Sequence, residues 1–490
     1  MSYLDDCNPA SLSHSTNQHL AYNVVRLHAS MALEGRQVPP LHMCVQGGGG
    51  VGKSYLVDCL VKYLREVAVA RGEDPHKFVV VAAPTGTAAL GVHGCTLHSL
   101  GSLPVNTEFK PLSGKPLQLL QLRVAGLTYL IVDERSMCGK IMLGRLDARL
   151  KQGMASDLKM GGVNYIFLGD DRQLPPVMDD PAYDKSPSNR KSLSSKVLAS
   201  AGCDVFDSFN VAVTLTHNFR QQGEGPGQKF FREALDRLAC GQQTLEDIEG
   251  YWLKHSIYTL PPARKLKFDE EAIHLCSRKA IMKLINAAQV SYLPGPFSSW
   301  NAKHVPNIKA ARQASSDIAG AENFTCMAPG AHVILTSNLW ITRGLVNGSM
   351  GSVVDLLYEE APSVSVCPAV VLVRFPSYSG PPALPPPYHP QIVPICLQAF
   401  QYMVGLQECT RINVPLRLSW AISIHKSQGM TFGEGKPISC CILHLGSREH
   451  SDGLTYVGCS RNMSDELMVF GGEPGNPEDP YPGGCGPPTC

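Results

Sequence analysis

Residues 47–54 read GGGGVGKS and combine the residue types that hold phosphate groups. They fit the pattern G-x-x-x-x-G-K-[ST], in which backbone N–H groups point at phosphate oxygens. In such a loop the lysine reaches the β- and γ-phosphates, and the hydroxyl that follows holds Mg²⁺. The predicted nucleotide contacts are therefore Gly47, Gly50, Gly52, Lys53 and Ser54, with Ser54 also a metal ligand. The alternative is a glycine linker that fits the pattern by chance.

Two further segments place polar residues directly after apolar runs. In LIVDERSM (130–137), Asp133 is predicted to bind Mg²⁺ and Glu134 to polarise an attacking water. An acidic strand end at a solvent edge is the alternative. In GDDRQLPPV (169–177), Gln173 is predicted to sense the γ-phosphate or to position water, whereas a turn with two prolines is the plainer interpretation. The three segments together indicate nucleotide hydrolysis.

This chemistry requires buried strands that end beside one another. Short runs that are apolar on both faces, each followed by Gly, Pro, Asp or Thr, occupy 41–46, 78–83, 127–132, 164–168 and 211–215. Such runs are typical of parallel strands with ligand loops at their carboxyl ends. After the first run, Leu56, Leu60, Leu64 and Val67 recur at helical spacing. Alternating strands and helices predict an α/β domain.

The second half of the chain shows a different pattern. Apolar runs at 273–276, 333–336, 438–445 and 467–470 indicate a second α/β domain. Short strands without long helices, at 351–355, 370–375 and 392–398, predict a small β-barrel inserted in it. Three segments are polar or proline-rich and are interpreted as loops or tail: 178–196, 376–390 and 471–490.

Composition narrows the class of protein. The 490 residues predict two to four domains, and a net charge of +1 neither supports nor excludes nucleic acid. Seventeen cysteines without a CxxC pair indicate free thiols in a reducing compartment. We see no secretory signal and no apolar run that would span a membrane. The expectation is an intracellular protein, in the nucleus rather than the cytoplasm or mitochondrion.

Nine segments, in the same order as in the family, resemble superfamily 1 helicases, and most of all the petite-integration-frequency (PIF) group of DNA helicases. The segments are GGGGVGKS (47–54), APTGTAAL (83–90), GCTLHSL (94–100), VDERSM (132–137), GDDRQLPPV (169–177), LTHNFRQ (215–221), GLVNGSMGSVV (344–354), WAISIHKSQGMTF (420–432) and YVGCSR (456–461).

The resemblance implies an α/β fold with two RecA-like P-loop NTPase domains and a small β-barrel inserted in the second. The first domain is expected at 1–220, with a short insert at about 101–126. The second is expected at 221–470, with the barrel at about 330–415, followed by a disordered tail at 471–490.

The resemblance also assigns roles to further residues. Gln18 in NQHLA is implied to read adenine, although an ordinary glutamine at a helix start is an equal alternative. Arg220 and Arg461 are implied to be arginine fingers, Arg461 from the second domain; a surface salt bridge is the alternative for each. Gly429 is a further implied nucleotide contact.

The DNA-contacting segments of the family place their candidates in two groups. The candidates are Thr85, His98 and Ser99 in the first domain and His425, Lys426 and Ser427 in the second. Hydroxyl and ammonium groups suit phosphate contacts that carry no sequence information. For His98, a structural histidine is nearly as good an interpretation. Trp300 and Trp340 are available for stacking on bases, but a core position is favoured for both.

Arg135 departs from the pattern, since the family usually has a small or apolar residue there. It places a formal charge beside the predicted Mg²⁺ site, which would alter hydrolysis unless the side chain turns to solvent. The function implied is an ATP- and Mg²⁺-dependent 5′–3′ DNA helicase, a monomer that acts on single strands and forks in repair, recombination or telomere and genome maintenance. The alternatives are a nucleic-acid-binding ATPase with little unwinding and an RNA helicase of the same superfamily.

Overall fold

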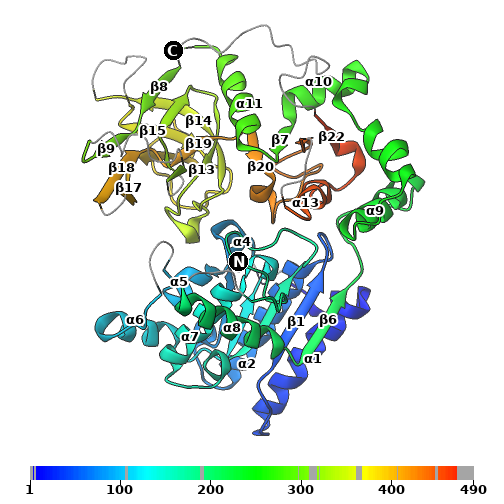
Figure 1. The fold of residues 1–490 in the computed structure, drawn as a ribbon, viewed down its shortest axis with the longest axis vertical. Helices are drawn as coiled ribbons and strands as arrows, with labels where there is room; N and C mark the ends of the chain where they lie inside the picture. Colours follow the sequence, from blue (N-terminus) through cyan, green and yellow to red (C-terminus); the bar gives the residue numbers. More distant parts are fainter. Residues whose placement is uncertain are drawn as a thin grey trace. The chain divides into compact units, whose positions relative to one another are not determined.

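The computed structural model describes residues 4, 7–104, 109–187, 192–295, 297–307, 317–318, 321–359, 367–404, 407–446 and 451–471 (Figure 1). The chain forms two compact units. One comprises Met1–Gln243 with His450–Asp465, and the other Thr244–Glu449 with Glu466–Cys490. The domain limits expected from the sequence stay a prediction, and the expected tail lies outside the described residues except for Gly471.

The first unit is built on a six-stranded parallel sheet. Its strands are β1 (His42–Gly47), β2 (Val79–Ala83), β3 (Cys95–Thr96), β4 (Tyr129–Val132), β5 (Asn164–Gly169) and β6 (Val211–Leu215), in the spatial order β3-β2-β4-β5-β1-β6. The five predicted strands are confirmed, and only the two-residue β3 was not predicted. Because every pair is parallel, all carboxyl ends lie at one edge of the sheet.

Helices cover both faces of this sheet (Figure 1). In β4, Ile131 packs with Leu60 and the other apolar residues of α1 (Thr16–Leu33) and α2 (Lys53–Ala70). Leu130 and Val132 face the other side, towards Leu146 and a second core. That core is covered by α6 (Gly114–Val124), α7 (Lys140–Met154) and α8 (Leu193–Asp207). Burial on both faces explains why the strands are continuous apolar runs.

Five more α-helices belong to the described part of the first unit. They are α3 (Pro75–Phe78), α4 (Gly86–Gly91), α5 (Leu97–Gly101), α9 (Pro226–Ala239) and α13 (Leu454–Ser460). No helix in the described part of the chain is both long and apolar enough to cross a membrane. The cysteines among the described residues are all free thiols, as predicted.

The second unit contains its own parallel sheet. The strands are β20 (Ala421–Ser423), β7 (Ile273–Cys276), β21 (Cys441–His444) and β22 (Met468–Phe470), in that spatial order, with α10 (Pro262–Glu271) and α11 (Lys279–Ser291). Three of these strands were predicted. The predicted strand at 333–336 belongs instead to an antiparallel sheet.

The remaining strands of the second unit are antiparallel. A five-stranded sheet has the order β16 (Ile392–Cys396), β15 (Val370–Arg374), β14 (Met350–Leu357), β13 (His332–Leu335) and β19 (Leu416–Leu418). A second sheet joins β17 (Gln398–Val404), β18 (Gln407–Asn413) and β9 (Lys303–Val305), and two strand pairs join β12 (Phe324–Met327) to β8 (Ser298–Asn301) and β10 (Asp317–Ile318) to β11 (Ala321–Glu322). Pairing within the described strands does not close a barrel, so the expected barrel stays a prediction.

A histidine pair lies inside the second unit. His274 on β7 and His444 on the neighbouring β21 are both buried, and the Nδ1 of His274 lies 2.9 Å from the Nε2 of His444. One ring must donate and the other accept, which requires at least one neutral ring. Burial, followed by the charge of His444, lowers the pKa of His274 to about 3. The folded unit therefore favours neutral His274, because burial disfavours its charged form.

We predict that acid destabilises this unit through His274. Its pKa is lower in the folded than in the unfolded chain, so the unfolded chain binds the extra proton. Stability is then full above about pH 6.5 and falls by about 1.4 kcal/mol per pH unit as the pH drops towards 3. The free energy of unfolding, measured with urea between pH 8 and pH 5, should change less with pH in His274→Asn than in the unaltered chain. Exposed His389→Asn is the matched control. The same pH dependence in all three proteins would contradict the role of His274.

Candidate nucleotide and nucleic-acid site

The loop between β1 and α2 is held by side chains on two sides. The Nζ of Lys53 donates to the carbonyl oxygens of Gly47 (2.7 Å) and Gly48 (2.9 Å). The Nε2 of buried Gln18 donates to the carbonyl oxygens of Val51 (3.0 Å) and Gly52 (3.2 Å). Gln18 thus supports the loop, and its predicted contact with adenine stays a prediction.

The glycines at the variable positions of the motif are explained by nearby arginines. Gly50 has φ of 87°, and a Cβ built on it would clash with the Cβ of Arg220. A Cβ at Gly49 would lie 2.9 Å from the Nη1 of Arg220, and one at Gly48 would lie 2.6 Å from the Nη2 of Arg172. The loop therefore requires glycine at position 50, which the motif leaves open, whereas a side chain at position 48 or 49 would meet only the ends of flexible arginine side chains.

Asp133 and Glu134 follow β4 at the same edge of the sheet. The Oδ1 of Asp133 accepts the backbone N–H of Glu134 (2.9 Å). Burial and then the charge of Glu134 raise the pKa of Asp133 to about 6, against the opposing charge of Lys53. Glu134 has φ of 54°, a left-handed conformation that costs on the order of 1–3 kcal/mol outside glycine. Its Oε2 is buried without a hydrogen-bond partner among the described residues.

Gln173 is held by an acid that the sequence interpretation missed. Its Nε2 lies 3.4 Å from the Oδ2 of fully buried Asp170, and its own Oε1 is buried without a partner in the described part of the chain. Asp170 also accepts from the Nε of Arg172 (3.1 Å) and from the hydroxyl of Tyr456 (3.1 Å). The missed signal is an acid directly after the apolar run of β5, the same signal that identified Asp133.

Arg220 and Arg461 both lie inside the first unit. We expected Arg461 from the second domain, but α13 packs with the first unit. The Nη1 of Arg220 donates to the carbonyl of Ser460 (2.9 Å), and the Nε2 of Gln221 donates to that of Asn462 (3.0 Å). Burial and then the charge of Arg461 lower the pKa of Arg220 to about 9, and burial lowers the pKa of Arg461. The surface salt bridge considered for Arg461 is wrong, since that residue is 1% exposed.

The charges around the loop balance in a way that suits a phosphate group with a cation. Burial lowers the pKa of Lys53, and the neighbouring Glu134, Asp133 and Asp170 oppose that effect. The half-buried guanidinium of Arg220 and the buried one of Arg461 repel each other, so an anion between them would relieve the repulsion. The unpartnered oxygens of Glu134 and Gln173 are acceptors without donors, which fits a bound water or ion.

No group of three His, Cys, Asp or Glu side chains gathers to hold a metal among the described residues. Mg²⁺ sites that use one or two carboxylates plus phosphate oxygens do not need such a group.

Arg135 does not turn to solvent. The side chain is buried, and its Nη2 donates to the Oδ2 of Asp171 (2.6 Å) and to the Oε1 of Gln46 (2.7 Å). Its Cζ lies 5.5 Å from the centre of the Phe206 ring. The charge that the sequence placed beside the metal site is therefore neutralised by an adjacent carboxylate.

The predicted DNA contacts differ in accessibility. In the first unit, Thr85 caps α4 by accepting the N–H of Ala88 (3.3 Å), and Ser99 is exposed on α5. His98 is half-buried, and this burial lowers its pKa, as for a structural histidine. These contacts stay predictions.

The second-unit candidates lie on the short helix η8 (Ile424–Ser427). His425 is exposed and Lys426 half-buried, whereas Ser427 is fully buried and donates to the carbonyl of Ile424 (2.7 Å). This position does not favour the predicted contact of Ser427 with DNA. Gly429 is exposed in the turn that follows, with φ of 80°, and its nucleotide contact stays a prediction.

The two tryptophans have different environments. Trp300 is buried, and its Nε1 donates to the Oδ1 of Asn413 (2.8 Å), so its predicted core position is confirmed. Trp340 lies between β13 and β14 and is 44% exposed, so the core position favoured for it is wrong. The guanidinium of Arg343 lies 6.0 Å from its ring centre. An exposed aromatic ring beside an arginine is suited to stacking on a base.

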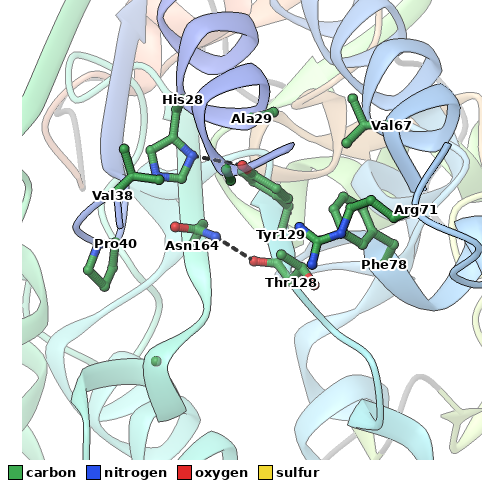
Figure 2. Close-up of a pocket in the computed structure, with 12 residues that line it drawn as sticks. His28, Ala29, Val38, Pro40, Val67, Arg71, Phe78, Thr128, Tyr129 and Asn164 are labelled. Atoms are coloured by element: carbon green, nitrogen blue, oxygen red, sulfur yellow. Dashed lines mark hydrogen bonds between the residues drawn. The ribbon is translucent and has the colours of Figure 1, made fainter. Parts of the chain in front are cut away.

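A cavity of about 170 Å³ lies at the opposite edge of the first sheet (Figure 2). It is lined by Tyr129 and Asn164, the first residues of β4 and β5, whereas the phosphate loop lies at the carboxyl ends of the strands. Its polar groups satisfy one another: His28 Nδ1 lies 2.7 Å from the hydroxyl of Tyr129, and Asn164 Nδ2 donates to the carbonyl of Thr128 (3.0 Å). It is therefore separate from the candidate site.

A parallel sheet with a phosphate loop after β1 and acids after β4 and β5 defines a P-loop nucleotide-binding domain. Residues 15–244 match the family model described as PIF1-like helicase. The resemblance to PIF-type helicases that the motifs predicted is thereby confirmed, since this part of the chain is similar to PIF1-like helicase domains.

Known proteins agree with this assignment. The ATP-dependent DNA helicase PIF1 of Danio rerio is 29% identical over 438 residues, which cover 87% of this chain and 58% of that protein. The crystal structure of Pif1 helicase from Candida albicans has 20% identity, covers 93% of each chain and gives a TM-score of 0.64. That of Pif1 from Bacteroides in complex with ADP-AlF3 and ssDNA has 24% identity, covers 90% of this chain and 91% of that one, and gives a TM-score of 0.57. The chain thus spans less than two thirds of the zebrafish relative's length, and the solved structures establish the shared fold.

We predict that Gly50→Ala weakens nucleotide binding. The added Cβ meets Arg220 and the left-handed backbone disfavours alanine, so the loop must move. We expect the Kd for a fluorescent ATP analogue to rise at least about tenfold, or ~1.4 kcal/mol. Gly227→Ala, on α9 with open space around its Cα, is the matched control and should bind normally. Unchanged affinity in Gly50→Ala would show that this backbone does not bind the nucleotide.

Proposed function

We propose that the chain is an ATP-dependent DNA helicase that moves 5′ to 3′ along single-stranded DNA and separates duplexes at forks. The observation that carries the proposal is the convergence of Lys53, Glu134, Gln173, Arg220 and Arg461 on one phosphate loop. The PIF1-like domain and the helicase names of the relatives support it. The 5′–3′ direction, a monomeric state and a nuclear role in repair, recombination or telomere maintenance rest on the resemblance alone.

In this proposal each residue of the site has one task. The loop backbone and Lys53 bind the β- and γ-phosphates, while Ser54, exposed at the start of α2, and Asp133 hold Mg²⁺. The bound Mg²⁺ would supply charge neutralisation between the phosphates. Glu134 accepts a proton from the attacking water, which Gln173 orients. Arg220 and Arg461 stabilise the negative charge that develops on the phosphate oxygens. Gln18 and Gly429 complete the nucleotide site.

Single-stranded DNA is proposed to contact both units. The candidates in the first unit are Thr85, His98 and Ser99, and those in the second are His425, Lys426 and Ser427; Ser427 would need its helix to rearrange. Trp340 is added as a stacking residue because of its exposure. A Bacteroides Pif1 structure contains ssDNA, which supports the choice of ligand. An ATPase that binds nucleic acid with little unwinding, or an RNA helicase, remains the second candidate function.

We predict ATP hydrolysis that single-stranded DNA stimulates and that Lys53→Ala abolishes. Removing the ammonium takes away the only lysine of the loop, so kcat should fall at least about a hundredfold (~2.7 kcal/mol). Release of inorganic phosphate measures the rate, and displacement of strands from 5′-tailed and 3′-tailed duplexes measures unwinding and its direction. Lys115→Ala, which removes an exposed lysine of α6, is the control. Displacement of the 3′-tailed duplex alone would contradict the direction, and greater stimulation by RNA than by DNA would favour an RNA helicase.

We predict that Trp340→Ala weakens binding of single-stranded DNA. Loss of one stacked base costs about 1–3 kcal/mol, which corresponds to a Kd roughly 5- to 150-fold higher. Fluorescence anisotropy with a labelled oligonucleotide measures the change. Tyr292→Ala, which removes another exposed ring of the second unit, is the control and should leave the Kd unchanged. Equal effects of both substitutions would argue against stacking at Trp340.

A further inference from the structure

Arg135 lies at a point where three strand ends of the first sheet meet. It directly follows Asp133 and Glu134, at the end of β4. Gln46, which accepts from its Nη2 at 2.7 Å, is in β1 and directly precedes the phosphate loop. Asp171, which accepts from the same nitrogen at 2.6 Å, follows β5 and precedes Gln173 by two residues. One guanidinium group thus connects the segment after β4, to which it belongs, with the other two segments of the nucleotide site.

The Glu134 side chain depends on its backbone for its position. Its Oε2 has no hydrogen-bond partner among the described residues, and its backbone is in the left-handed region. The residue before it is fixed, since Asp133 accepts the Glu134 N–H. The residue after it is Arg135, whose backbone packs closely on Gly169. A Cβ built on Gly169 would lie 2.9 Å from the backbone nitrogen of Arg135. The bonds of Arg135 therefore hold the carboxylate from the other side.

The Arg135 charge is buried and needs its partner. The Arg135 side chain is 4% exposed, whereas that of Asp171 is 33% exposed. Removing only the carboxylate would leave a buried cation beside Gln46, and a buried charge that loses its partner destabilises its surroundings strongly. Removing both charges avoids that cost. The role of the pair can thus be tested by substituting Asp171, its more exposed member, with asparagine, which adds no volume to the core.

We propose that Arg135, paired with Asp171 and bonded to Gln46, is a positioning residue that fixes Glu134 relative to the phosphate loop and to Gln173. The inference rests on the proposed hydrolysis of ATP and adds to it how the general base is oriented. Arg135 acts through the backbone and touches no phosphate. Loss of the pair should then lower the rate of the chemical step and leave nucleotide binding nearly unchanged.

The test is a double-mutant cycle in the full chain, with DNA-stimulated ATP hydrolysis as the measurement. We expect Asp171→Asn to lower kcat about tenfold, the usual scale for residues that orient a site from outside, with KM for ATP changed less than about twofold. Arg135→Met should lower kcat to a similar degree. The double variant should be about as slow as each single variant and no slower, because the same interaction is already lost in each.

The matched control is Asp236→Asn. Asp236 pairs with Arg172 of the same segment at 3.2 Å but is exposed, so this variant should keep kcat within about twofold. The inference is overturned if Asp171→Asn keeps the normal kcat, if KM rises in proportion to the loss of kcat, or if the two single losses simply multiply in the double variant.

A binding measurement separates this inference from the proposed function. Kd for a fluorescent ATP analogue should stay within about twofold in all four proteins of the cycle, and a change above tenfold in Asp171→Asn would overturn the positioning role. If the unaltered chain binds the analogue but hydrolyses no ATP with DNA present, the proposed function fails. If the unaltered chain hydrolyses ATP but the effects of the Arg135 and Asp171 substitutions are independent, the proposed function stands and only the positioning role of Arg135 is rejected.

Discussion

The burial of opposite charges around one loop is the constraint on which the rest of the first unit depends. Arg461 is buried and Lys53 partly buried beside Glu134 and Asp170, and burial lowers the pKa of each cation and raises that of Asp133. An isolated buried charge is expensive, so each of these groups needs the others in place. The balance remains incomplete, because two arginines repel each other and two side-chain oxygens have no partners among the described residues. Such strain is tolerated where a ligand relieves it.

The parallel sheet brings these charges together. Each acid follows a different strand, and the order β4-β5-β1 places the ends of the three strands side by side. Because helices cover both faces of the sheet, the strand residues are apolar, and the first polar residue after each run lies at the carboxyl edge of the sheet. Asp133, Asp170 and the phosphate loop occupy this position. The fold thus determines the site before any single side chain is considered.

This regularity explains what the sequence could predict. Strands buried on both faces give short apolar runs, and five of the six in the first sheet were predicted from them. The loop, Lys53 and the acids after β4 were predicted because their spacing is local. β20 was not predicted, since three residues within AISIHKSQG give too short a run. The position of Arg461 could not be predicted either, because the hydrogen bonds that join α13 and Asn462 to Asp170, Arg220 and Gln221 link residues more than two hundred positions apart.

The loop opens with four glycines, and contacts in the structure bear on those that the sequence motif does not require. The pattern requires only Gly47 of that run, and flexibility alone does not explain the other three. Gly48 and Gly49 face Arg172 and Arg220, and Gly50 has a left-handed backbone against Arg220. Those arginines are positioned in turn by Asp170 and by the carbonyl of Ser460. The glycine at position 50 is therefore a consequence of the packed Arg220, and any change that moves α13 or Asp170 would alter the space in which phosphate is proposed to be held.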